Sequence, residues 1–257
     1  MKSLKSLNKS TKNNMITYII VFAMFLFCLV YTGSGAASNL FQGILVPICV
    51  NVILAISLNL TVGILGELSL GHAGFMCVGA FAGSIFSVLA SSSMESALIR
   101  FPLALLIGGI AAAIVGVLVG IPVLRLRGDY LAIVTLAFGE IIKNIVNNLY
   151  IVKDSAGFHM ALGVDAYNSM ELDAAGREVI VNGAMGITGT PKDSNYIIGF
   201  ILIFITLLVI LNLVHSRTGR AIMSIRDNRI AAESVGINIT KYKLIAFTVS
   251  AFFAGVA

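Results

Sequence analysis

The sequence is poor in charged residues. Only 11% of its 257 residues are Asp, Glu, Lys or Arg, whereas 58% are hydrophobic, and the mean hydropathy is +0.98. A soluble domain carries roughly a quarter charged residues. A chain with so little charge cannot cover itself with a water-soluble surface. The composition therefore excludes an ordinary soluble protein and predicts an all-α polytopic membrane protein whose spans are helices.

Cysteines and catalytic motifs are also scarce. All three cysteines lie in apolar segments, where a thiol usually serves as a small packing residue: Cys28, Cys49 and Cys77. Neither a disulfide framework nor a metal site is expected, and no convergent catalytic set is visible. The basic residues are scattered among the apolar segments. The net charge of +5 thus favours contact with anionic lipid or a protein partner over nucleic acid.

Long apolar runs predict the membrane spans. The first could be a cleaved signal peptide, since "GSGAAS" follows it, but its long basic flank and the later spans favour an uncleaved helix. The last run has 14 residues, too few to cross a bilayer, so we expect it to be an incomplete helix at the end of the chain. The predicted spans are residues 15–31, 40–64, 75–90, 101–124, 129–152, 195–214 and 244–257.

Charge placement predicts the orientation. Four lysines in the tail 1–14 place the N-terminus in the cytoplasm, because basic loops stay inside. Alternating the spans puts the basic loop 215–243 inside and the loop 153–194 outside. The outer loop has three basic and six acidic residues, in agreement with that count. We therefore predict a multi-pass membrane protein whose N-terminus is cytoplasmic.

Glycines crowd an intramembrane stretch, "LNLTVGILGELSLGHAGFMCVGAFAG" (58–83). Six glycines between 63 and 83 weaken a continuous helix and favour a break or re-entrant turn. Ionisable Glu67 and His72 lie in this stretch, and such residues inside a membrane are functional candidates. Either they line a permeation path or they mark a cytoplasmic turn between two spans. The candidate path residues are Asn59, Glu67, Gly71, His72, Thr135 and Glu140.

Three other segments carry local signals. Glu140 and Lys143 lie three residues apart on a predicted helix, which indicates either self-neutralisation or a direct role in transport. Small residues every four positions between Gly108 and Gly120 predict close helix packing. The stretch "GAMGITGTP" (183–191) predicts an ordered external turn, which could be a partner contact or only a loop.

The stretch 216–236 interrupts two apolar runs with basic residues. Ser216 and Thr218 can cap a helix start and Gly236 suits its stop, so a short amphipathic helix is predicted on the cytoplasmic side. A helix lying on the membrane surface would show the same pattern.

These segments resemble the branched-chain amino acid permease family of ABC importers, the LivM type. The resemblance rests on four motifs in order: "LGELSLGHAGFMCVGAF" (65–81), "RGDYLAIVTLAFGEI" (127–141), "GAMGITGTP" (183–191) and "SRTGRAIMSIRDNRIAAESVGINITKYKLIAFTVSAFFAGVA" (216–257). It implies an ABC importer permease-type helical bundle that carries leucine, isoleucine and valine. Permeases for urea or other amino acids look similar, so the substrate stays open.

The resemblance also implies partners and a coupling element. The cytoplasmic segment would dock on an ATPase subunit, and Ile230 replaces the Glu that leads the general importer signature. The chain has no G-x-x-x-x-G-K-[ST] loop, so two separate ATPase subunits would use the ATP, beside a second permease subunit and an extracytoplasmic substrate-binding protein. The implied coupling residues are Arg217, Arg220, Arg226, Asp227, Ala231, Ala232, Glu233 and Gly236.

Two classes of protein compete with this interpretation. A secondary transporter or channel would use the Gly-rich break as an ion site, but would give no reason for "AAESVG" in a basic loop. A membrane-embedded enzyme would need a convergent catalytic set. Residues 152–181 resemble an insertion in the family pattern, and the spans that normally follow "FAGVA" are missing, so we expect this chain alone not to transport.

Overall fold

The structure is a computed structural model of the chain. It describes residues 9–35, 37–91, 96–126, 128–154, 157–169, 178–187, 189–190 and 193–257. Within these ranges, seven helices are long and apolar enough to cross a membrane. The predicted all-α membrane fold is therefore confirmed, with one small sheet added at one end.

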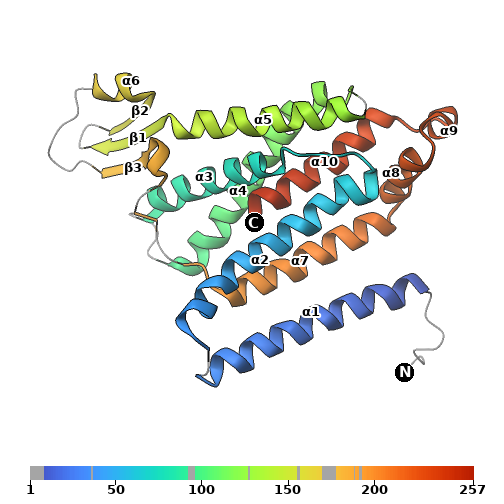
Figure 1. Cartoon of the computed structure of the whole chain (residues 1–257), viewed down its shortest axis with the longest axis horizontal. Coiled ribbons are helices and arrows are strands. Elements are labelled where there is room, and N and C mark those ends of the chain that lie inside the picture. Colours follow the sequence, from blue (N-terminus) through green and yellow to red (C-terminus); the bar gives the residue numbers. More distant parts are fainter. Residues whose placement is uncertain are drawn as a thin grey trace.

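The seven long helices lie side by side in a bundle (Figure 1). Helix α1 lies at its edge, beside α7, whereas α10 lies among α2, α3 and α4. The seven are α1 (Lys9–Gly33), α2 (Asn39–Asn59), α3 (His72–Ser91), α4 (Ala97–Val123), α5 (Asp129–Asn147), α7 (Tyr196–His215) and α10 (Ile239–Val256).

Glycines bring α3, α4 and α10 into close contact. A Cβ at Gly108 of α4 would lie 2.6 Å from the carbonyl oxygen of Gly79 in α3, and one at Gly116 would lie 2.8 Å from the Cβ of Ala251 in α10. Helix backbones approach this closely in membranes only where side chains are small. The small-residue spacing of α4 therefore marks helix packing, as predicted.

Helix α10 begins earlier than the sequence suggested. The predicted apolar run started at 244, but the helix starts at Ile239 and its 18 residues are enough to cross a membrane. Asn238 caps it, accepting a hydrogen bond from the amide of Lys241. The difference arises because Lys243 is 3% exposed inside the bundle, whereas its charge had placed it in a loop.

Beyond the far end of α5 the chain forms a three-stranded antiparallel sheet in the order β2-β1-β3. Its strands are β1 (Leu149–Asp154), β2 (Gly157–Leu162) and β3 (Glu178–Asn182), with the short helix α6 (Val164–Asn168) after β2. Helix α5 thus ends at Asn147, before the predicted limit of 152, because residues 149–152 pair in β1. Buried Ile180 and Val181 pack the sheet against Val88 of α3. Part of the presumed insertion is therefore folded structure.

The start of "GAMGITGTP" is an ordered turn, as expected. Its first residues form a 3-10 turn, η3 (Gly183–Met185), and Ile187 bridges back to Val181. Residues 188, 191 and 192 lie outside the described part of the chain.

A buried ion pair of 2.6 Å joins Arg100 of α4 to Asp193, just before α7.

Candidate functional site

Two short helices, not one, form the basic segment at the other end of the bundle. Helix α8 (Arg217–Asp227) begins at Ser216 and α9 (Arg229–Ser234) begins at Asn228; each of these side chains accepts a hydrogen bond from a helix amide. Because Asn228 is extended and caps α9, the single predicted helix is divided there. Gly236 has a φ of +86°, which confirms the expected left-handed stop.

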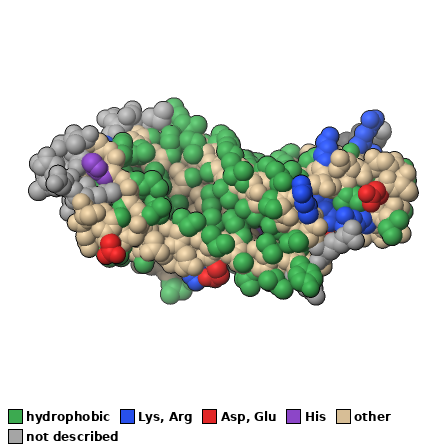
Figure 2. Space-filling view, turned by 90° about the horizontal axis from the view of Figure 1, so that it is seen from above, with side chains coloured by type: hydrophobic (Ala, Val, Ile, Leu, Met, Phe, Trp, Pro, Cys, Tyr) green, Lys and Arg blue, Asp and Glu red, His purple; other side chains and the backbone are tan. Residues whose placement is uncertain are grey.

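The two helices present charged and apolar side chains outward. Ile230 and Val235 of the α9 region are 82% and 80% exposed. Exposed apolar side chains beside basic residues can be covered by a partner protein or by the membrane surface. Lys and Arg gather at this end of the molecule (Figure 2), whereas much of the remaining face is hydrophobic.

Ala232 points the other way. It is 4% exposed and packs with Ile225 and Ile239 inside this chain. A partner docking on α9 would thus meet Ile230 and Val235 rather than Ala232, and a large residue at 232 would first disturb this chain's own packing. The other implied coupling residues are all exposed: Arg217, Arg220, Arg226, Asp227, Ala231, Glu233 and Gly236.

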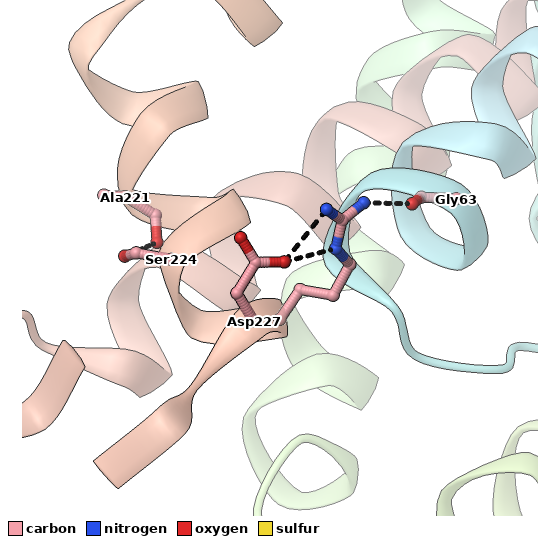
Figure 3. A network of polar contacts seen from close by, with 5 residues as sticks. Gly63, Ala221, Ser224 and Asp227 are labelled. Carbon is pink, nitrogen blue, oxygen red and sulfur yellow. Dashed lines mark hydrogen bonds and ion pairs between the residues drawn. The ribbon is translucent and has the colours of Figure 1, made fainter. Parts of the chain in front are cut away.

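Arg226 joins α8 to the end of the second span. Its Nε and Nη2 donate to Oδ1 of Asp227 at 3.1 and 2.9 Å, and its Nη1 donates to the carbonyl oxygen of Gly63 at 3.1 Å (Figure 3). The stem of Arg226 lies against Gly66, where a Cβ would come within 2.6 Å of Cγ. The planar guanidinium thereby links the basic segment to the Gly-rich break.

The predicted break is present. Helix α2 continues into a π-helical turn, η2 (Leu60–Leu65), which ends at Gly66 with a φ of +78°. Residues 67–71 are not helical, and α3 begins at His72. In Figure 1 this linker runs back from the α8 end of the bundle to the start of α3 further inside.

The linker is fixed by buried polar contacts. The carboxylate of Glu67 forms an ion pair with Lys243 of α10, whose side chain is 4% exposed. Beyond it, the amide of Leu70 donates to Oγ1 of Thr135 in α5 at 3.1 Å. A Cβ at Gly71 would collide with the carbonyl oxygen of Thr135, so only glycine fits there. Thr135 therefore positions the linker.

His72 is buried beside Ser57. Its Nε2 lies 2.8 Å from Oγ of Ser57 in α2, and Ser250 of α10 donates to the Ser57 carbonyl at 2.6 Å. Ser57 precedes the end of η2 by eight residues, so α3 begins roughly two helical turns inside that end. Irregular backbone at such a depth is tolerated where protein or a water-filled cavity surrounds it. Among the described residues no cluster of three His, Cys, Asp or Glu could hold a metal ion.

The candidate path residues do not form one cluster. Glu67, Gly71, His72 and Thr135 belong to the linker and its contacts. Glu140 pairs with Lys143 at 3.4 Å on an exposed side of α5, and of the other candidates only Gly71 lines the same groove as this pair. Asn59 is exposed at the end of α2, where its side-chain amide lies beside Gly63 of the break.

Sequence reasoning missed three residues of this network: Lys243, Ser57 and Ser250. The only sequence signal was the position of Lys243 at the edge of an apolar run, and a lysine at such an edge favours a loop.

A bundle of seven possible membrane helices, with a break inside it and a basic helix pair hydrogen-bonded to that break, defines a multi-pass membrane protein. The chain belongs to the family described as "Branched-chain amino acid transport system / permease component", whose match covers residues 40–257. The resemblance seen in the four motifs is thus confirmed.

Two relatives are similar over much of the chain. Both are named high-affinity branched-chain amino acid transport system permease protein LivM: the one from Salmonella typhimurium is 37% identical and the one from Escherichia coli 36% identical, each over 213 residues. The matched region is 80% of this chain and 48% of each relative, so the chain spans about half the length of these curated relatives. No solved structure is significantly similar.

Proposed function

We propose that this chain is a transmembrane permease subunit of an ATP-driven importer for branched-chain aliphatic amino acids such as leucine, isoleucine and valine. The observation that carries the proposal is the contact of Arg226 with Gly63, because it connects an exposed basic segment directly to the broken span. Movement of α8 can thus reach the break without passing through a flexible loop.

The proposal includes the partners and the orientation. The segment α8–α9 and the N-terminus face the cytoplasm of a bacterial-type plasma membrane, and α8–α9 docks on one of two ATPase subunits. A second permease subunit and an extracytoplasmic substrate-binding protein complete the assembly. This chain is a transport subunit without a catalytic site of its own; it binds no cofactor, and its partners use the ATP.

The experiment compares two exposed apolar residues at opposite ends of the molecule. Ile230→Asp introduces a charge on α9, whereas Met185→Asp does so beside the sheet, where the native side chain is equally open at 79% exposure. In the assembled transporter, Ile230→Asp should weaken capture of the ATPase subunit about tenfold or more, since an unpaired charge buried at an interface costs more than 1.4 kcal/mol. Met185→Asp should leave capture unchanged.

Uptake of labelled leucine is measured in parallel. Competition by unlabelled valine and by urea separates an amino acid permease from a urea permease. Normal ATPase capture and leucine uptake in Ile230→Asp would contradict docking on α9. Absence of energised leucine uptake by the wild-type assembly would contradict the proposed function itself.

A further inference from the structure

Helix α5 has two exposed sides of opposite character. Its buried side, which includes Leu131 and Thr135, packs on the bundle. Residues three and four apart share a helix face. On that basis one exposed side carries aliphatic residues, whereas the other is aliphatic at Ile133 and Leu136 and carries charges and amides from Glu140 onward. The first consists of Val134, Ile141 and Ile145, and the polar part of the second of Glu140, Lys143, Asn144 and Asn147.

The polar side reaches well into the bundle. Glu140 precedes the helix end at Asn147 by seven residues, which is about 10 Å. The side chains of Glu140 and Lys143 are 59% and 64% exposed, although α5 is long and apolar enough to be a span. Charged residues in spans face the bundle interior or a water-filled cavity rather than lipid. Lipid suits the aliphatic side of α5, so the polar side requires water or protein.

A groove lies along this polar side. Its volume is about 350 Å³, and its far wall is the linker and the first turns of α3. Glycines bring the two sides of the groove close together, since a Cβ at Gly74 would come within 3.2 Å of the Cα of Gly139. The groove is lined by Leu70, Gly71, Ala73, Gly74, Cys77, Leu136, Gly139, Glu140 and Lys143. It thus combines one anion, one cation and small or aliphatic residues.

We infer that this groove is a water-filled part of the translocation route, in which Lys143 binds the carboxylate and Glu140 the ammonium group of a zwitterionic α-amino acid in transit. The inference rests on the proposed function and names the groups that meet its substrate. The Nζ of Lys143 and Oε2 of Glu140 lie 3.4 Å apart, a long ion pair. The ammonium group of a zwitterion can replace Lys143 as the partner of Glu140, and its carboxylate can replace Glu140 as the partner of Lys143. Each side chain therefore keeps an opposite charge beside it while the zwitterion passes. Its aliphatic side chain would lie against Leu70, Ala73 and Leu136.

A charge-exchange series tests the assignment in the assembled transporter. Glu140→Gln and Lys143→Met should each lower leucine uptake about tenfold, the usual effect of losing one charge-assisted hydrogen bond. The exchanged variant Glu140→Lys/Lys143→Glu keeps an ion pair but reverses its order along the groove, and its uptake should stay low. Capture of the ATPase subunit and the amount of membrane-inserted chain should not change. Lys153→Met, which removes a charge on β1, is the control and should transport normally.

Two results of that series would overturn the inference. If the exchanged variant or the neutral variant Glu140→Gln/Lys143→Met transports leucine like the wild type, the pair only neutralises itself. If the single variants transport normally, the pair does not meet the substrate.

The native cysteines provide a second, independent measurement. Cys28 and Cys49 are 4% and 2% exposed, whereas Cys77 lines the groove. With Cys28 and Cys49 changed to Ser, a positively charged methanethiosulfonate reagent should modify Cys77, because the thiolate is the reactive form and apolar surroundings without water disfavour it. Saturating leucine should slow the modification several-fold. A Cys77 that does not react, or reacts equally fast with leucine, would overturn the inference. These outcomes differ from failure of the proposed function, in which the wild-type assembly itself takes up no leucine.

Discussion

Glu67 in the linker between η2 and α3 forms an ion pair with Lys243 of α10, and this contact ties the break in the second span to the most buried helix of the bundle. The side chains are 19% and 4% exposed. Among the described residues, Oε2 of Glu67 has no hydrogen-bond partner. A buried pair of this kind stabilises little in itself, but removing one partner leaves an uncompensated charge.

Lys243→Met should therefore destabilise the protein strongly. Loss of one partner of a buried ion pair costs about 3–5 kcal/mol, because the remaining charge stays desolvated. The measurement is the midpoint temperature of thermal unfolding of the detergent-solubilised protein. It is determined by size-exclusion chromatography of heated samples. The double variant Glu67→Gln/Lys243→Met has no charge left at this place and should recover most of the loss. A double variant that is as unstable as Lys243→Met would show that packing, not charge, is responsible.

Gly71→Ala should loosen the linker. The added Cβ would meet the carbonyl oxygen of Thr135, so the linker and α5 must move apart, and overpacking of this kind costs about 1–3 kcal/mol. Gly43→Ala is the matched control, since nothing lies within 4 Å of a Cβ there. Gly43 lies in the second turn of α2, so the alanine should stabilise the helix by up to about 1 kcal/mol. Equal thermal midpoints for the two variants would contradict the close contact at Gly71.

Arg226→Ala should uncouple the basic segment from the break. The variant loses the hydrogen bond to Gly63 and the contact of its stem with Gly66. Leucine-stimulated ATP hydrolysis by the assembled transporter should fall about tenfold, a change that corresponds to 1.4 kcal/mol. ATPase capture, however, should fall less, because Ile230 and Val235 remain.

Arg226→Lys separates charge from geometry. It keeps the charge but not the planar guanidinium, which donates to Asp227 and Gly63 at once, so stimulation should recover only in part. Full stimulation in both variants would show that the link is not used.

Single cysteines test the orientation in a cysteine-free background. Met185→Cys and Val235→Cys replace side chains that are 79% and 80% exposed at opposite ends of the bundle. An impermeant thiol reagent added to intact cells should label position 185 and not position 235, since basic loops remain inside. The reverse labelling would refute the proposed topology.

Much of the fold could be predicted because its signals are local. Low charge and long apolar runs indicate membrane helices wherever they occur in a chain. The break between η2 and α3 follows from the density of glycine around Gly66, which weakens a helix without help from other elements. Gly236 shows the same principle, since a left-handed helix end favours glycine whatever packs nearby.

The tertiary structure alone decided which side chains meet. Lys243 was predicted to lie in a loop because lysine avoids membranes, yet Glu67, 176 positions earlier, provides its partner inside the bundle. Ala232 was expected to face a partner, but Ile225 and Ile239 cover it within this chain. A sequence pattern indicates that a helix face is apolar or consists of small residues. Which surface covers that face depends on how distant helices are arranged, and that arrangement is set by the packing of the whole bundle.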